Sequence, residues 1–518
     1  MSYQTIHAKP NGVKYVYEAT SYWDKELKAP RNKQVCIGRL DEATGNIVPT
    51  KRGSKPSAQP KTSSPAAAVP ITAVCRIVGP TSLLGKVATD IGLIDILRQC
   101  YPESHSKILS LAYFLVQKGL PLSRCEAWSA SHKHPFGDEL ASQRVSELLH
   151  EISEDSRLEF FKLWMEHLSE TECFYYDITS VSSYSEHNEY VRWGYNRDKE
   201  DLPQINLGML FGQKSALPGY YRRLPGNIPD VSTLQTTVQM LGVIGQTRLT
   251  FVLDRGFYKV KNVNDLFSER MRFILACPSR KWNCALYEQY ADEIISHNNR
   301  HALGEQEVLY MQTVLHKWGN RRCYVHIYYN DTKAAADRDE FALNLAKWKE
   351  ELTTDNEDKD NVWAYKQYFT VKDLPVRGRK IVENIEAIEK SRKKHMGFFC
   401  LLTPYKTDAL SVIETYRSKE SVENCFDDLK NMLDMNRLRV HSSPAMDSRL
   451  FIQFIASIIL SKVRHIKNQN IKLKHYSVRE IMELMETISD VKLSDKRKPV
   501  TTEAGPVQRL ITEHFGIT

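Results

Sequence analysis

The sequence predicts an α+β protein of several domains, whose largest part is a mixed β-sheet flanked by helices. The chain has 518 residues, too many for a single small core, and 42% of them are hydrophobic. Two strand-like runs, 173–177 and 249–254, each end in an aspartate, whereas the last hundred residues carry mainly helical patterns. Strands that come first and helices that follow are typical of the α+β class.

Composition allows a nucleic-acid partner but does not require one. The chain has 71 Lys+Arg against 63 Asp+Glu, a net charge of +8, which many enzymes without such a partner share. The ten cysteines stand singly, which excludes a zinc ribbon or a disulfide framework and suits reduced thiols in the cytoplasm. We expect no signal peptide and no membrane contact, because the most apolar run, 450–463, is too short to cross a bilayer.

The N-terminal part is expected to be a small β unit, 1–48, followed by a linker, 49–72. Alternating aromatic residues in 13–22 and a return run in 34–40 predict the strands. Their aromatic side chains could stack on bases or cover a thin sheet. The linker is rich in Pro and Ser and contains no acid, so it could follow a phosphate backbone or be a solvated tether; its cations are Lys51, Arg52, Lys55 and Lys61.

A helical domain is predicted for 73–168, where apolar residues recur at helical spacing and Pro121 and Pro135 mark breaks. Such a unit could bind DNA, contact a second subunit or cap the core. The expected helices are 82–98, 106–118, 144–152 and 155–167.

The sheet is predicted to begin in 169–280, with strands 174–178, 204–211, 250–254 and 273–277 and a helix at 263–269. Acids at strand ends, with helices to follow, favour a ribonuclease-H-like fold. The segment 218–227 is expected to be a loop, whose Arg222 and Arg223 could hold a phosphate or be ordinary surface charges.

An insertion domain, 281–395, is expected because the candidate acids Asp254 and Glu423 lie far apart in the sequence. A bare ribonuclease-H core needs only a few tens of residues between these two acids. Strand-like alternation at 323–329 and 365–371 and a helical pattern at 334–349 support it. The core would resume in 396–470, with a strand at 397–402. C-terminal helices would fill 471–518, the first opened by a capping box at Ser477 and Glu480.

The segment 415–430 is predicted to be one helix, around which the chemistry is organised. Its buried face would consist of apolar residues at helical spacing, namely Val422, Cys425, Phe426, Leu429 and Leu433. Four polar residues fall within an arc of roughly 60° beside that face. They are Tyr416, Lys419, Glu423 and Lys430.

Two strand-borne aspartates, Asp177 and Asp254, and the helix-borne Glu423 are the candidate metal ligands and catalytic residues. Each could alone be a strand-end cap, but together they match a two-metal phosphoryl-transfer site, because Mg²⁺ prefers carboxylate oxygens on rigid elements. A second polar cluster follows Asp177 and is interpreted as a solvated loop rather than a metal site; it comprises Tyr184, Glu186, His187 and Glu189.

These residues resemble a known signature. Tyr416-x2-Lys419-x3-Glu423-x6-Lys430 is similar to the Tyr-x2-Arg-x3-Glu-x6-Lys motif of insertion-sequence DDE transposases of the IS4 superfamily. The surroundings of Asp177 and Asp254 (Tyr-Asp-Ile-Thr-Ser-Val and Asp-Arg-Gly-Phe-Tyr), and the start of the chain, resemble the IS1634 branch. Lys419 stands where arginine is usual, which keeps the charge but loses the two-pronged phosphate contact.

The resemblance implies a prokaryotic, nucleoid-associated cytoplasmic enzyme that acts on double-stranded DNA, as a homodimer on paired element ends. It would cleave the terminal inverted repeats and join the 3′-hydroxyls to target DNA with two Mg²⁺ ions, which Mn²⁺ could replace. Tyr416, Lys419 and Lys430 would bind DNA phosphates. A nuclease of the same fold without strand transfer, or a catalytically silent DNA-binding descendant, are the alternatives.

The resemblance also implies that the insertion is largely β and holds the DNA end, in some relatives by trapping a flipped base. Trp318, Trp348 and Trp363 are candidates for stacking on such a base, although a tryptophan in a folded domain more often belongs to the core.

Overall fold

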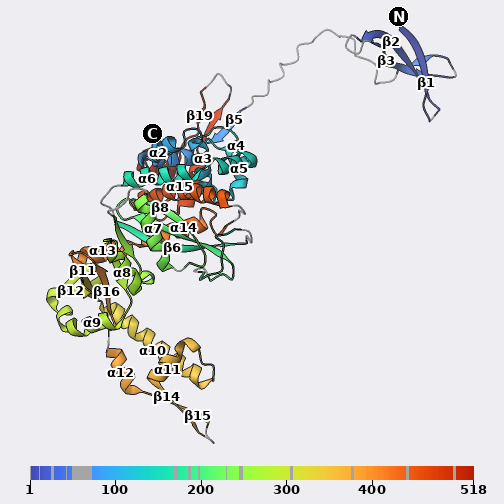
Figure 1. Ribbon diagram of the computed structural model, residues 1–518. Coiled ribbons are helices and arrows are strands. Elements are labelled where there is room, and N and C mark those ends of the chain that lie inside the picture. The colour runs from blue at the N-terminus through green and yellow to red at the C-terminus, as the bar shows by residue number, and fades with distance from the viewer. Residues whose placement is uncertain are drawn as a thin grey trace. The chain divides into compact units, whose positions relative to one another are not determined.

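The computed structural model of the chain consists of two compact units, Met1–Thr72 and Ala73–Thr518 (Figure 1). The structure describes residues 2–10, 12–24, 29–42, 44–49, 73–168, 173–184, 188–196, 199–228, 230–243, 249–303, 307–374, 378–393, 395–438, 443–493 and 498–517. The basic linker expected at 49–72 lies outside the described residues except for Pro49.

The N-terminal unit is an antiparallel sheet of four strands in the order β1-β2-β3-β4. These are β1 (Ser2–Ala8), β2 (Lys14–Asp24), β3 (Ala29–Leu40) and β4 (Ile47–Val48). Among its described hydrophobic residues only Val16 and Ala19 are buried, whereas Tyr3, Tyr22 and Trp23 are exposed. The unit is therefore a thin sheet with very little core of its own.

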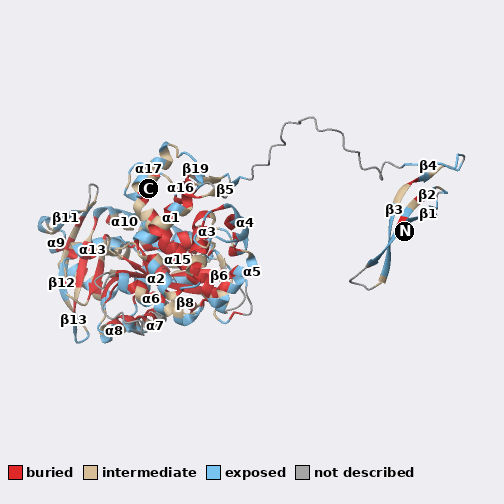
Figure 2. Ribbon diagram, turned by 90° about the horizontal axis from the view of Figure 1, so that it is seen from above, coloured by how far each residue is buried: buried red, intermediate tan, exposed pale blue. Residues whose placement is uncertain are grey.

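Two groups of helices lie toward the two ends of the second unit's sequence. The first group comprises α1 (Gly79–Asp90), α2 (Leu93–Cys100), α3 (His105–Lys118), α4 (Cys125–Ser131), α5 (Ser142–Glu151) and α6 (Glu154–Leu168). The last group comprises α15 (Ser443–Asn468), α16 (Val478–Met485) and α17 (Pro506–His514). Helices α3 and α15 pack together at the centre of the helical layer, where buried residues concentrate (Figure 2). No helix of the described segments is long and apolar enough to span a bilayer.

Two details of the helical layer refine the sequence prediction. The helix expected over 82–98 is divided between α1 and α2, because Gly92 adopts a left-handed conformation with φ of 68°. The capping box at Ser477 and Glu480 is confirmed at the start of α16. A small sheet in the order β19-β18-β5 joins the start of this unit to its C-terminal part; its strands are β5 (Val74–Ile77), β18 (Ser489–Lys492) and β19 (Val500–Thr501).

A mixed sheet is the centre of the second unit, with the strand order β11-β12-β13-β16-β10-β9-β6-β7-β8 and β17 paired to the end of β6. Strand β9 is parallel to both β6 and β10, whereas β7, β8, β16, β13, β12 and β11 join antiparallel. The strands are β6 (Cys173–Ser183), β7 (Gln204–Gly212), β8 (Pro218–Pro225), β9 (Thr250–Leu253), β10 (Arg272–Cys277), β11 (Arg300–Leu303), β12 (Glu307–Trp318), β13 (Arg321–Tyr329), β16 (Phe398–Thr403) and β17 (Arg437–Leu438).

Helices cover both faces of this sheet. The helices next to it are α7 (Asp230–Val243), α8 (Val260–Ser268), α9 (Lys281–Ile294), α13 (Ala409–Arg417) and α14 (Glu420–Asn431). The face that carries Asp177 is covered by α14, whose Cys425 Sγ lies 3.7 Å from Met209 Sδ on β7. The opposite face meets α7, where the hydroxyl of Tyr176 hydrogen-bonds Thr237 Oγ1 at 3.2 Å. Short 3-10 turns occur at η1 (Leu122–Arg124), η2 (Arg255–Phe257), η3 (His297–Asn299) and η4 (Lys359–Asn361).

The segment 281–395 differs from the largely β insertion that was expected. Strands β11, β12 and β13 extend the central sheet, and the remainder forms a mainly helical lobe with a small core of its own. The lobe comprises α10 (Asp331–Thr353), α11 (Val362–Tyr368), α12 (Ile385–Lys393), β14 (Phe369–Leu374) and β15 (Gly378–Glu383). The expected strand at 365–371 is half helix, because Ala364, Tyr365 and Tyr368 are buried at helical spacing.

Candidate active site

Asp177 and Asp254 lie side by side on neighbouring parallel strands. Tyr176 on β6 is in register with Leu253 at the end of β9, so the next residue of each strand is the aspartate. The Oδ1 atom of each is held by a backbone amide: Ile178 N–H donates to Asp177 at 2.9 Å, and Arg255 N–H donates to Asp254 at 2.6 Å. The sheet therefore fixes both carboxylates before any side chain from a helix reaches them.

The predicted helix 415–430 is in fact two helices, α13 and α14, which are separated at Ser418 and Lys419. At the break, Lys419 N–H donates to Tyr416 O at 3.4 Å and Val422 N–H donates to Lys419 O at 2.9 Å, both over three residues rather than four. The apolar face of α14 is buried as predicted, through Val422, Cys425, Phe426, Leu429 and Leu433. The single helical arc expected for the polar residues is therefore wrong.

The break directs Lys419 into the site. Its Nζ lies 3.6 Å from Asp177 Oδ2 and 3.3 Å from Asp254 Oδ2, and the residue is only 8% exposed. The hydroxyl of Tyr416 donates a hydrogen bond to Asp254 Oδ1 at 3.1 Å. The structure thus brings together four of the six residues that the sequence singled out.

The electrostatics of this cluster keep its acid and its amine charged. Burial raises the pKa of Asp254, but Lys419, the Arg255 amide and the Tyr416 hydroxyl outweigh it, so the pKa lies below its ordinary value. Burial lowers the pKa of Lys419, but Asp177, Asp254 and Glu423 outweigh it, so the pKa lies above its ordinary value. The charge of the buried Lys419 is stabilised mainly by its partners, whereas the carboxylate of Asp254, whose side chain is 44% exposed, is stabilised by its partners and by solvent.

Glu423 and Lys430 are less closely engaged. Glu423 is exposed on α14, one turn beyond Lys419, and lies near enough to contribute to the raised pKa of that lysine. Lys430, near the end of α14, is among the charges that lower the pKa of Glu200, after the stronger effects of Ser182 and Arg437. Within the described segments, no three His, Cys, Asp or Glu side chains are gathered closely enough to form a metal site.

The pair of aspartates nevertheless fits a hard divalent cation. Their two Oδ2 atoms converge on one point, which the ammonium of Lys419 occupies as a stand-in cation. Carboxylate oxygens on rigid strands are the donors that Mg²⁺ prefers.

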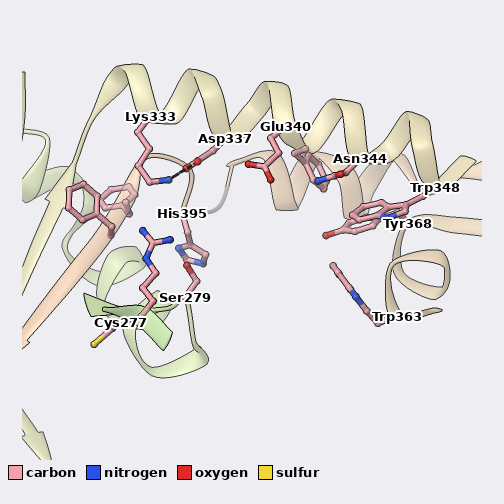
Figure 3. Close-up of a pocket in the computed structure, with 14 residues that line it drawn as sticks. Cys277, Ser279, Lys333, Asp337, Glu340, Asn344, Trp348, Trp363, Tyr368 and His395 are labelled. Carbon is pink, nitrogen blue, oxygen red and sulfur yellow. Dashed lines mark hydrogen bonds and ion pairs between the residues drawn. The ribbon is translucent and has the colours of Figure 1, made fainter. Parts of the chain in front are cut away.

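A cavity of about 410 Å³ has Arg255, the residue that follows Asp254 in the chain, in its wall. At its other end Trp348 and Tyr368 stack with ring centroids 5.8 Å apart, and Trp363, which is 57% exposed, stands edge-on to Trp348 (Figure 3). Trp318 lies elsewhere, and its indole N–H donates to Asn264 at 2.8 Å.

Sequence reasoning missed the other polar groups of this cavity, which include Lys333, Asp337 and His395 (Figure 3). Lys333 is paired with Asp337 at 2.6 Å, and this spacing of four residues on a helix is too common to have indicated a cavity. Arg255 could have been found, because it follows Asp254 directly in the Asp-Arg-Gly-Phe-Tyr motif.

The two arginines of segment 218–227 and the described residues of the polar cluster that follows Asp177 lie outside the site formed by Asp177, Asp254 and Lys419. The segment 218–227 is mostly strand β8 and not a loop, and its arginines have protein partners: Arg222 donates to the carbonyl of Thr236, and Arg223 pairs with Asp447 at 3.0 Å. In the second polar cluster, Tyr184 and Glu189 are exposed, whereas Glu186 and His187 lie outside the described residues.

Comparison with known proteins places the chain. A family model described as the transposase DDE domain matches residues 169–459, more than half of the sequence. The chain belongs to this family of DNA transposases. It is also similar, at 10% identity and a TM-score of 0.34, to the piggyBac transposase in a cryo-EM structure of a synaptic complex with hairpin DNA. That match covers 78% of this chain and 70% of that chain. Among curated proteins, none matches the sequence.

Proposed function

We propose that this transposase is the cut-and-paste enzyme of an IS4-superfamily insertion sequence, of the IS1634 branch. It cleaves double-stranded DNA at the terminal inverted repeats of the element and joins the 3′-hydroxyls to target DNA. The observation that carries the proposal is the convergence of Asp177 and Asp254, from adjacent parallel strands, on a single cationic position. The signature residues Tyr416 and Lys419 contribute to the same cluster.

The topology of the sheet supports a ribonuclease-H-like core. Strands β8, β7, β6, β9 and β10 are consecutive neighbours, with the first three antiparallel to one another and the last two parallel to β6. In such a core the acids stand on the central strand and on its parallel neighbour, which are β6 and β9 here. Strands β16, β13, β12 and β11 are additions on the far side of β10.

The chemistry follows from the positions of the charged groups. Two Mg²⁺ ions, for which Mn²⁺ would substitute, would be held by Asp177, Asp254 and Glu423 and would supply an activated attacking oxygen and a stabilised leaving oxygen. The sheet holds the first two carboxylates in place, and α14 carries the third. Tyr416, Lys419 and Lys430 are the groups of α13 and α14 that would contact DNA phosphates, which position the strand without reading its sequence.

The helical lobe would hold the DNA end beside these acids. Its cavity combines the guanidinium of Arg255 at the Asp254 side with the aromatic rings of Trp348, Trp363 and Tyr368. A phosphate at the arginine and an unstacked base against the exposed Trp363 ring would match this arrangement. The proposal includes a homodimer that pairs two element ends in the cytoplasm of a prokaryotic cell, at the nucleoid.

The test is a DNA cleavage and joining reaction with the DNA that flanks the coding sequence on both sides, in Mg²⁺. Asp254→Asn should reduce cleavage by at least about a thousandfold while the protein still binds the DNA, because a neutral amide is a poor ligand for a divalent cation. Asp292→Asn, an exposed aspartate on α9, is the matched control and should cleave normally.

Three outcomes contradict the proposal in different ways. Cut ends that never join a target would indicate a nuclease. DNA binding without cleavage by the unaltered protein would indicate a silent descendant. Full cleavage by Asp254→Asn would remove this acid from the chemistry.

A further inference from the structure

In Asp177 and in Asp254, the two carboxylate oxygens have different kinds of partner, and the arrangement is the same in both residues. In each, Oδ1 accepts a hydrogen bond from a backbone amide, and Asp254 Oδ1 also accepts one from Tyr416. In each, Oδ2 faces the ammonium of Lys419, at 3.6 Å from Asp177 and 3.3 Å from Asp254. The position between the two Oδ2 atoms is therefore already filled by a positive charge of the protein itself.

One ammonium does not balance this site. Two carboxylates face Lys419, and Glu423 adds a third negative charge nearby; even with Arg255, whose charge acts on Tyr416, the described charges around this largely buried lysine remain negative in sum. A divalent cation at the same position would neutralise the two aspartates better than the single charge of the lysine. The cation and the ammonium cannot share it, since both require contact with the same pair of Oδ2 atoms.

We propose that Lys419 is an internal counter-ion that a divalent cation displaces, so that the lysine becomes available to a DNA phosphate only when the cation is bound. This rests on the proposed function, in which the two aspartates hold the cation. Lys419 stands at the break between α13 and α14, and its ammonium would leave the two carboxylates by side-chain rotation alone, with the backbone hydrogen bonds of the break unchanged.

The presence of lysine rather than arginine suits this exchange. An ammonium on a flexible stem can move between a carboxylate pair and a phosphate, whereas a planar guanidinium is held more firmly by a two-pronged contact. The lysine thereby couples the two binding events: occupation of the carboxylates by the cation releases the group that receives DNA.

The test is the affinity of the full chain for Mn²⁺ without DNA, measured by isothermal titration calorimetry. Lys419→Met should bind Mn²⁺ at least about tenfold more tightly than the unaltered protein, because the competing charge is gone. Lys419→Arg should bind Mn²⁺ no more tightly than the unaltered protein, since it retains the charge and its guanidinium is held more firmly by the carboxylates. The matched control is Lys86→Met, which removes a lysine from an exposed ion pair with Asp90 on α1 and should not change the affinity.

Equal or weaker Mn²⁺ binding by Lys419→Met would overturn the proposal. Should that variant fold poorly, Lys419→Gln serves in its place, and the rise in melting temperature on addition of Mn²⁺ should be larger for it than for the unaltered protein. Asp254→Asn separates this proposal from the one on which it rests. If Asp254→Asn binds Mn²⁺ normally, the metal site itself is misassigned, whereas a loss of binding there with no gain in Lys419→Met rejects only the exchange.

Discussion

Two ionisable side chains stay charged at one half of the central sheet, whereas two stay neutral in the other half. Around β6 and β9, the partly exposed Asp254 and the buried Lys419 keep one another charged. Around β13, burial lowers the pKa of His326 to about 4 and raises the pKa of Cys323 to about 11, so that both are neutral near pH 7. The hydroxyls of Thr313 and Thr403 satisfy the ring nitrogens of His326, and the opposing charge of Asp408 is too weak to offset burial.

The difference shows what sets the candidate site apart within one sheet. Burial alone favours neutral groups, so an interior carboxylate remains ionised only where a cation or several donors meet it. In the β13 half, burial outweighs the charge of Asp408, and His326 is held neutral by its hydrogen-bond partners. The β6 half gathers charged groups, which is the physical basis for the divalent-cation site that we propose.

The largest expected effect on the free energy of unfolding comes from the buried apolar face of α14. Leu429 is fully buried on the helix that carries Glu423, so Leu429→Ala should lower the free energy of unfolding by about 2–5 kcal/mol. Leu315→Ala, at an exposed position of β12, should change it by less than about 0.5 kcal/mol. Chemical denaturation of both variants measures the contrast, and equal effects would mean that α14 is not held by its apolar face.

The next largest effect is the pH dependence of the free energy of unfolding that His326 causes in the β13 half of the sheet. The pKa of His326 is lowered by burial to about 4, so the stability it contributes is complete above about pH 6.5 and is lost as the pH falls toward 4. The loss should reach about 3 kcal/mol. In His326→Gln the free energy of unfolding should fall less steeply over this range, whereas the exposed His301→Gln should follow the unaltered protein. Parallel pH curves for all three would contradict the account of the neutral half.

The smallest expected effect on the free energy of unfolding comes from the hydrogen bond that the Tyr416 hydroxyl donates to Asp254. Tyr416→Phe removes one hydrogen bond to a charged acceptor, and should lower the free energy of unfolding by about 1–2 kcal/mol. Tyr329→Phe removes a comparable bond to the exposed Asp331 and should cost less, because water can replace the hydroxyl there. Thermal unfolding of the two variants compares them, and a larger cost for Tyr329→Phe would show that the Tyr416 bond is not part of an interior cluster.

The sequence predicted the parts of the site that depend on local pattern. The strand-borne aspartates and the buried stripe of α14 follow from periodicities that tertiary structure did not override. The break at Ser418 and Lys419 could not be predicted in this way, because it contains neither glycine nor proline and coincides with the ion pairs of Lys419 to acids far away in the chain.

Two other differences have separate origins. The segment 218–227 was expected to be a loop, yet strand β8 within it pairs with β7, and most of that strand is buried. The insertion 281–395 was expected to be largely β by resemblance, whereas the spacing of the buried residues in its lobe favours helices. A partner remote in sequence decided the first outcome, and local spacing decided the second.

The most direct test of the central claim is the anomalous scattering of Mn²⁺ in crystals of the full chain. We predict density between Asp177 and Asp254, with Glu423 turned toward it from α14 and Lys419 displaced from the two Oδ2 atoms. Manganese bound elsewhere, or Lys419 still within about 4 Å of both aspartates at full Mn²⁺ occupancy, would contradict the account.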